Sequence, residues 1–151
     1  MGTVKTFSRY LAGAVLLLPL AGDLSAAESK PGIEITTHPR SGRGKVGCTL
    51  FASERGFPAK SELAHRRMWA PIVKGKAICR FANVKPGTYA VAVLHDENGN
   101  NKMDTNWVGM PKEGYGASRD AKPGTFSGPK FKDARFRYPG GRVAMTLKLR
   151  Y

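Results

Sequence analysis

The run DENGNNKMD has residue types and a spacing that could bind a metal ion. Asp96, Asn98, Asn100 and Asp104 occupy positions 1, 3, 5 and 9 of this run, and the backbone carbonyl of Lys102 falls at position 7. Calcium takes about six to eight hard oxygen ligands, which a curled chain supplies by directing alternate side chains inward. The spacing therefore predicts a calcium-binding loop.

This loop departs from the EF-hand pattern at two positions. Asn101 stands at position 6, where an EF-hand has glycine, and Trp107 at position 12 cannot supply a bidentate carboxylate. The loop also follows a predicted strand and not a helix, so it is not an EF-hand. Because position 12 lacks a carboxylate, a remote one such as Glu113 would have to complete the coordination shell. Its low charge predicts a weak affinity, roughly 10⁻⁴–10⁻³ M. The alternative is a polar turn whose Asp and Asn side chains bond their own backbone.

Aromatic side chains follow the acidic run. Trp107, Tyr115 and Phe126 lie among glycines in a segment with little periodicity. Aromatic rings on such a loop can stack against a sugar or a peptide. Trp107, Glu113 and Tyr115 are therefore candidate binding residues. The alternative is that the aromatic rings cap the open end of the domain and anchor the loop.

The adjacent His95 and Asp96 are the residues that could perform acid–base chemistry. The alternative is a structural histidine whose ring bonds a neighbouring loop carbonyl. No zinc motif, nucleophile elbow, phosphate loop or dinucleotide fingerprint occurs in the sequence. We therefore predict that the protein is not an enzyme. The alternative is a small hydrolase or lyase that uses His95 and Asp96.

Most of the elements that would position these side chains are predicted to be β-strands. Seven runs have strand periodicity or an apolar strand composition, over 33–37, 46–51, 68–72, 77–81, 89–94, 131–138 and 143–149. The wholly apolar run 89–94 predicts a central strand. The turn Lys74–Gly75 predicts a hairpin between the third and fourth runs, with a helix over 60–68 as an alternative to the third. We expect an all-β fold, a small antiparallel β-sandwich of about seven strands, with one long irregular loop over 98–130.

Two cysteines fall on the predicted core-facing side of different strands. Cys48 shares a face with Val46 and Leu50 in the second run, and Cys79 shares a face with Ala77 and Phe81 in the fourth. Two such thiols in an oxidising compartment can pair. We predict a Cys48–Cys79 disulfide, with two buried free thiols as the alternative.

The N-terminal 27 residues have the composition of a secretory signal peptide. Lys5 and Arg9 precede an apolar stretch over 11–20, and small residues lead to cleavage before Glu28. We predict a signal peptide over 1–27 and a single domain over 28–151, exported to the periplasm or the extracellular space. The apolar stretch is short for a membrane span, so no span is expected after cleavage; a retained N-terminal anchor is the alternative.

The chain is strongly basic, with 25 Lys and Arg against 11 Asp and Glu among its 151 residues. Without residues 1–27 it has 23 basic and 10 acidic side chains, a net charge of +13. Export argues against a nucleic-acid partner. Anionic envelope polymers or another exported protein are the expected partners, and a solvated basic face is the alternative.

The sequence resembles a family of small exported bacterial proteins with a domain of unknown function. The resemblance rests on VKPGTYAVAVL, HDENGNNKMDTNWVGMPKEGYGAS, GFP at 56–58, PKFKDARF and LKLRY, which together extend over nearly all of the mature chain. It implies a transthyretin-like or prealbumin-like β-sandwich. The stretch FANVKPGTYAVAV is similar to the collagen-adhesin B-type fold, and DENGNNKMD to the calcium loops of adhesin B repeats. The resemblance implies no established activity.

The function predicted from the sequence is that of an exported, non-enzymatic binding or structural module with a calcium-like loop. The first alternative is the hydrolase or lyase. The second is a basic module that binds anionic envelope components through its charged surface.

Overall fold

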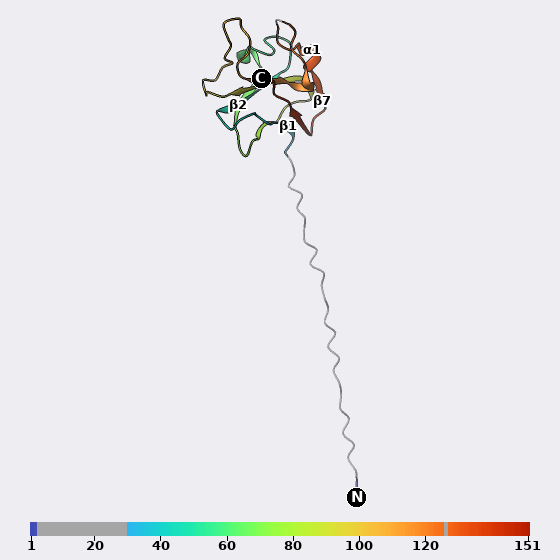
Figure 1. Ribbon diagram of the computed structural model, residues 1–151. Helices are drawn as coiled ribbons and strands as arrows, with labels where there is room; N and C mark the ends of the chain where they lie inside the picture. Colours follow the sequence, from blue (N-terminus) through green and yellow to red (C-terminus); the bar gives the residue numbers. More distant parts are fainter. Residues whose placement is uncertain (3–29, 126) are drawn as a thin grey trace.

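The computed structural model describes residues 1–2, 30–125 and 127–151 (Figure 1). Residues 3–27 of the predicted signal peptide, its cleavage point and Phe126 lie outside the described residues. In the part of the chain that is described, no helix is long and apolar enough to cross a membrane.

Within the described residues, eight strands form two sheets. The three-stranded sheet has the order β4 (Ala77–Ala82), β1 (Gly32–Thr37) and β8 (Arg142–Leu147). The five-stranded sheet has the order β3 (Arg66–Pro71), β2 (Lys45–Phe51), β5 (Gly87–Asp96) and β6 (Gly114–Ala117), with β7 (Phe136–Tyr138) also paired to β5. The prediction of an all-β sandwich is confirmed.

The core lies between the inner faces of the two sheets. Alternate residues of each strand point inward, among them Ile35 of β1, Leu50 of β2 and Val91 of β5, and these three side chains have no exposed surface. This is the pattern expected of sheets with one face on the core. The inward row of β5 ends at His95, which places a histidine at the edge of this core.

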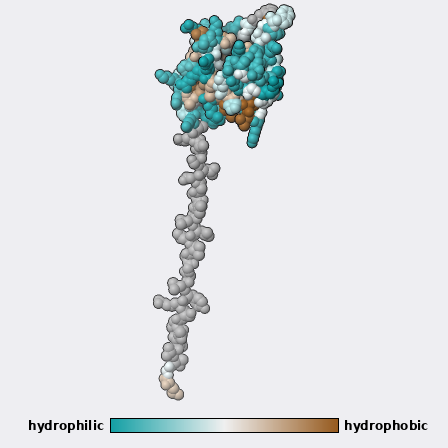
Figure 2. All heavy atoms as spheres, turned by 90° about the vertical axis from the view of Figure 1, so that its left-hand side faces the viewer, coloured by the Kyte–Doolittle hydropathy of each residue, from teal (hydrophilic) through white to brown (hydrophobic). Residues whose placement is uncertain are grey.

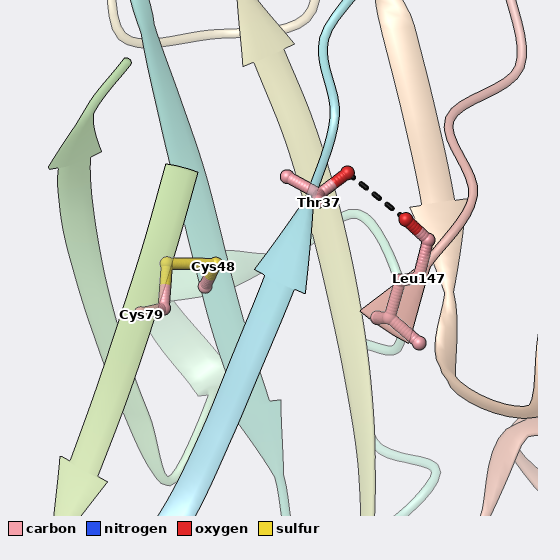
Figure 3. The surroundings of a disulfide bond; sticks show 4 residues. All are labelled: Thr37, Cys48, Cys79 and Leu147. Atoms are coloured by element: carbon pink, nitrogen blue, oxygen red, sulfur yellow. Dashed lines mark hydrogen bonds between the residues drawn. A yellow bond between two sulfur atoms is a disulfide. The ribbon is translucent and has the colours of Figure 1, made fainter. Parts of the chain in front are cut away.

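A disulfide joins the two sheets through the core (Figure 3). Cys48 lies on β2 and Cys79 on β4, with their Cα atoms 6.4 Å apart, so the predicted pairing is confirmed. In the same region the Thr37 hydroxyl donates to the carbonyl of Leu147 and ties β1 to β8.

Two short helical segments pack on part of the outer face of the five-stranded sheet. They are η2 (Ser118–Asp120) and α1 (Phe131–Ala134), and a third segment, η1 (Ser61–Leu63), precedes β3. A second apolar cluster forms beneath η2 and α1 around Ala90, Ala117 and Ala134. In the view of Figure 2 the surface is mostly hydrophilic, with hydrophobic residues in small patches.

Two predictions about strand pairing are wrong. The runs on either side of Lys74–Gly75 do not form a hairpin, because β3 pairs with β2 and β4 pairs with β1. The turn therefore carries the chain from one sheet to the other. The sandwich is also not wholly antiparallel, since β1 and β8 run parallel. A period-two pattern identifies the buried face of a strand but not its partner. The number of strands in the described residues, eight, is close to the predicted number of about seven.

Two predicted segment boundaries are also wrong. The run 131–138 is not one strand, because α1 precedes β7. Phe131 and Ala134 lie three residues apart and pack on the sheet at helical spacing. The loop over 98–130 is not wholly irregular, because it contains β6 and η2. Its strand pattern is hidden by two glycines: a Cβ at Gly114 would lie 2.4 Å from the Tyr151 ring, and one at Gly116 would lie 2.4 Å from a backbone oxygen.

Candidate functional site

The acidic loop begins where β5 ends and is organised around the Asp96 carboxylate. Oδ1 accepts hydrogen bonds from the N–H groups of Gly99 and Asn100, over 2.7 and 3.1 Å. Oδ2 accepts from the N–H of Asn101 over 2.9 Å. Asp96 has no exposed surface. Three donated backbone hydrogen bonds compensate the burial of this charge and curl the chain around it.

Residues 98–104 continue the same curl. The side-chain oxygens of Asn98 and Asn100 each accept from the backbone N–H two residues further on, at Asn100 and Lys102. The amide nitrogens of both asparagines donate to the two carboxylate oxygens of Asp104. The side chains of Asn98, Asn100 and Asp104 therefore converge. The Asp96 carboxylate bonds only backbone N–H groups of the loop, and the Lys102 side chain is exposed.

Glu113 closes the loop from the far end. Its Oε1 accepts from the N–H of Glu97 over 2.8 Å, and its Oε2 accepts from the N–H of Asp104 over 3.1 Å. The side chain is 4% exposed. One carboxylate thus holds both ends of the acidic loop together. The structure thus brings Glu113 to the acidic loop, where both of its carboxylate oxygens accept from backbone N–H groups. Its role as a calcium ligand stays a prediction.

The donor set of the loop fits a weakly held hard cation at best. No group of three or more His, Cys, Asp or Glu within the described ranges is arranged to hold a metal ion. A calcium ion would depend on Asp96, Asp104 and neutral amide oxygens, and both carboxylates already accept hydrogen bonds. The alternative of a hydrogen-bonded polar turn describes the contacts in full.

A short apolar loop, which we call the tip loop, extends over residues 105–111. Thr105 and Pro111 pair at its base. The Asn106 side-chain oxygen accepts from the N–H groups of Val108 and Met110, over 3.1 and 2.9 Å. Two backbone hydrogen bonds, one from Asn106 to the Met110 carbonyl and one from Gly109 to the Asn106 carbonyl, complete the turn. The backbone of the tip loop is therefore held in place by its own hydrogen bonds.

The side chains of the tip loop point into solvent. Trp107 is 95% exposed, and Val108 and Met110 are 55% and 53% exposed. The alternative in which Trp107 caps the sandwich is therefore wrong. The structure also separates the three predicted binding residues, since Glu113 is buried at the base and the half-buried Tyr115 lies on β6.

His95 is enclosed at the end of the core. Its Nε2 lies 2.8 Å from the Arg43 carbonyl oxygen, which can only accept, so Nε2 carries the proton. Nδ1 then accepts from the Tyr151 hydroxyl over 2.8 Å. With no exposed surface and both ring nitrogens bonded, His95 has the geometry of a structural histidine.

Tyr151 links this histidine to the loop before β2. The N–H of Arg40 donates to the Tyr151 hydroxyl, and the Arg40 guanidinium lies 4.2 Å from the centre of its ring. Arg40 also pairs with Glu97 over 2.8 Å. Burial of the hydroxyl raises the pKa of Tyr151, and the nearby Glu97 carboxylate adds to the rise, whereas the Arg40 N–H and charge oppose it.

Three residues of this arrangement were not predicted from the sequence. Tyr151 and the Arg43 carbonyl bond the histidine from sites 56 and 52 residues away, and no local pattern signals such contacts. Asn106 was detectable in principle, because an asparagine before a Gly–x–Pro stretch is typical of a side-chain-capped turn.

Comparison with known proteins supplies a family and no activity. The family model described as an uncharacterised protein conserved in bacteria (DUF2141) matches residues 33–146. That range begins in β1 and ends in β8, and it contains the acidic loop and the tip loop. No curated protein and no solved structure matches the chain. The likeness to transthyretin-like and adhesin B-type sandwiches stays a prediction.

Proposed function

Because this chain belongs to DUF2141, a family of uncharacterised proteins conserved in bacteria, we propose its function from its own geometry. It is an exported, non-enzymatic binding module, and its tip loop contacts another exported protein. The acidic loop and Glu113 form the rigid base that presents the tip loop.

The exposure of Trp107 is the observation that carries this proposal. An indole that is 95% exposed gains nothing from packing within its own chain, and two more large apolar side chains stand beside it. Tryptophan is enriched among the residues that dominate protein interfaces. The hydrogen bonds within the tip loop fix its backbone before binding, which lowers the entropy lost when a partner docks.

The surroundings of His95 favour a binding role over a hydrolase or lyase. A general base must reach the proton it abstracts. Both ring nitrogens are bonded, and the ring has no exposed surface. Asp96 is engaged by three backbone N–H groups. Neither side chain is available to a substrate in this arrangement.

Export is supported by the signal-peptide composition of residues 1–27 and by the disulfide. Disulfides persist in oxidising compartments and are rare in the cytosol. Mass spectrometry of the protein recovered from the envelope fraction should find Glu28 as the first residue. Recovery of the soluble protein with Met1 intact would overturn the assignment of the signal peptide.

Calcium enters the proposal as a weak stabiliser of the acidic loop. The ion would be held by Asp96, Asn98, Asn100, the Lys102 carbonyl and Asp104. It would supply positive charge at the place where the asparagine amides now donate hydrogen bonds to Asp104. Since hydrogen bonds already close the loop, the tip loop should be presented with or without the ion.

Affinity capture from the envelope of the exporting cell tests the binding role. The wild-type domain should retain a protein partner that Trp107→Ser loses, while Val73→Ser should retain it. Val73 is a fair control because it is also large, apolar and 59% exposed, and it lies on the turn between β3 and β4. Equal recovery with Trp107→Ser would overturn the proposal.

A further inference from the structure

A row of side chains crosses the outer face of the five-stranded sheet where the helical segments do not cover it. The register aligns Trp69 of β3 with Gly47 of β2, Gly47 with Leu94 of β5, and Leu94 with Tyr115 of β6. Arg150 pairs with Tyr115 and extends the row beyond β6. Directly paired residues in antiparallel strands point to the same face. Trp69 and Tyr115 are therefore three strand spacings apart, roughly 14 Å.

Gly47 provides the flat floor on which Trp69 lies. A Cβ at this position would come within 2.7–3.1 Å of three atoms of the indole, Cζ3, Cη2 and Cε3. The ring therefore leans across Gly47 along the surface of the sheet, and the residue is 39% exposed. Only glycine gives the indole this position. The result is a flat aromatic surface beside the half-buried Leu94 and Tyr115.

Positive charge surrounds this aromatic row. The Lys45 ammonium lies 4.8 Å from the centre of the Trp69 ring. Arg67 lies two residues before Trp69 on β3 and therefore faces the same side of the sheet. Arg150 lies at the far end of the row. Among the described residues, none of these three cations forms an ion pair. Asp96 ends β5 on this face, but its carboxylate is buried and bonded to backbone N–H groups.

We propose that this face, the Trp69–Arg150 row, binds an acidic polysaccharide. Sugar rings present flat C–H faces that pack on exposed indole and phenol rings, and their carboxylates pair with Lys45, Arg67 and Arg150. The length of the row suits several linked sugars better than a single one. Its flatness and its unpaired cations favour a charged linear polymer over a protein surface, which would need a larger apolar centre. This site is distinct from the tip loop and does not depend on it.

Binding to a defined polyuronate tests the proposal, with polygalacturonate as the probe and the mature domain in calcium-free buffer. Neutral dextran should not bind, because it lacks carboxylates. Poly-glutamate should bind at least tenfold more weakly, because it has charge without rings. Trp69→Ala should weaken polygalacturonate binding roughly tenfold, about 1.4 kcal/mol. Lys45→Gln should weaken it too, and more steeply at low salt.

Gly47→Ala is the sharpest variant, because it displaces the indole without removing an aromatic ring or a charge. It should reproduce most of the loss seen with Trp69→Ala. Thermal melts of each variant verify folding, and Val73→Ala and Lys74→Gln are matched controls that should bind like wild type. The proposal is overturned if Trp69→Ala and Gly47→Ala both bind within twofold of wild type. It is equally overturned if poly-glutamate binds as tightly as polygalacturonate, since charge alone would then explain the binding.

Discussion

Removing the Glu113 carboxylate should release both ends of the acidic loop at once. In Glu113→Ala the N–H groups of Glu97 and Asp104 lose the acceptor that joins them. No other side chain bonds either of these groups in the described structure. The acidic loop and the tip loop, which lie between β5 and β6, should then lose their common anchor.

The size of the effect follows from the two hydrogen bonds. A hydrogen bond to a charged group contributes about 1.5–3 kcal/mol, and an unsatisfied buried donor costs a similar amount. Both donors belong to half-buried residues, so water can replace part of the loss. We therefore expect Glu113→Ala to lower the free energy of unfolding by about 2 kcal/mol. For a domain of this size that corresponds to roughly 8 °C in Tm.

Urea unfolding and amide hydrogen exchange would measure this effect. The amides of Glu97 and Asp104 should exchange faster in Glu113→Ala, together with those of the tip loop. Glu113→Gln should lose about half as much stability, because the amide keeps one acceptor oxygen. Glu62→Ala is the matched control, since Glu62 is exposed. This role of Glu113 would be refuted if the free energy of unfolding of Glu113→Ala lay within about 0.5 kcal/mol of wild type and exchange at both amides were unchanged.

Three further predictions concern the disulfide, calcium and Tyr151. The bridge closes a segment with a sequence separation of 31 residues. On the chain-entropy model, replacing both cysteines by alanine should therefore lower the free energy of unfolding in urea by about 3–4 kcal/mol. Thiol titration of the unreduced, denatured protein should find no free thiol, and two reactive thiols would refute the bridge. Calcium at ten times its dissociation constant should stabilise the fold by about 1.4 kcal/mol and raise the Tm in a thermal scan. Asp104→Asn should abolish this rise. If the Tm of the wild type does not change, the acidic loop is only a hydrogen-bonded turn. Because the pKa of Tyr151 is raised in the fold, the neutral phenol is the form that the fold favours. The stability that the neutral Tyr151 hydroxyl contributes to the fold should be complete below pH 10 and decline as the pH rises through the pKa of the folded state. An absorbance titration should show one tyrosine ionising late, absent in Tyr151→Phe, and an unshifted midpoint would contradict the burial of this hydroxyl.

The sequence predicted those parts of the fold that depend on local alternation. Val91 and Val93 mark a buried strand by composition alone, and Cys48 and Cys79 mark two inward faces that meet in the core. Strand partners were not predictable, because the turn at Lys74 fits a hairpin as well as a crossing between sheets. That choice depends on the packing of the whole sandwich, which no short window contains.

In the candidate site, too, local features were predictable from the sequence and long-range contacts were not. The spacing of Asp96, Asn98 and Asn100 identified the curled loop, because their side chains bond backbone groups a few residues away. The exposure of Trp107 was not predictable, since an aromatic ring on a glycine-flanked loop can pack inward or point outward. The bonding of His95 to Tyr151 needed the fold itself, because the two residues are 56 positions apart.

Site-specific photo-cross-linking in the living exporting cell tests most directly whether the tip loop is the contact surface. A photoreactive amino acid replaces Trp107 in one strain and Val73 in another, and the adducts are resolved by mass after irradiation. We expect a discrete protein adduct at position 107, none at position 73, and a weaker adduct at 107 when Glu113→Ala is added. The absence of any protein adduct at position 107, or equal adducts at both positions, would show that the tip loop is not the contact surface.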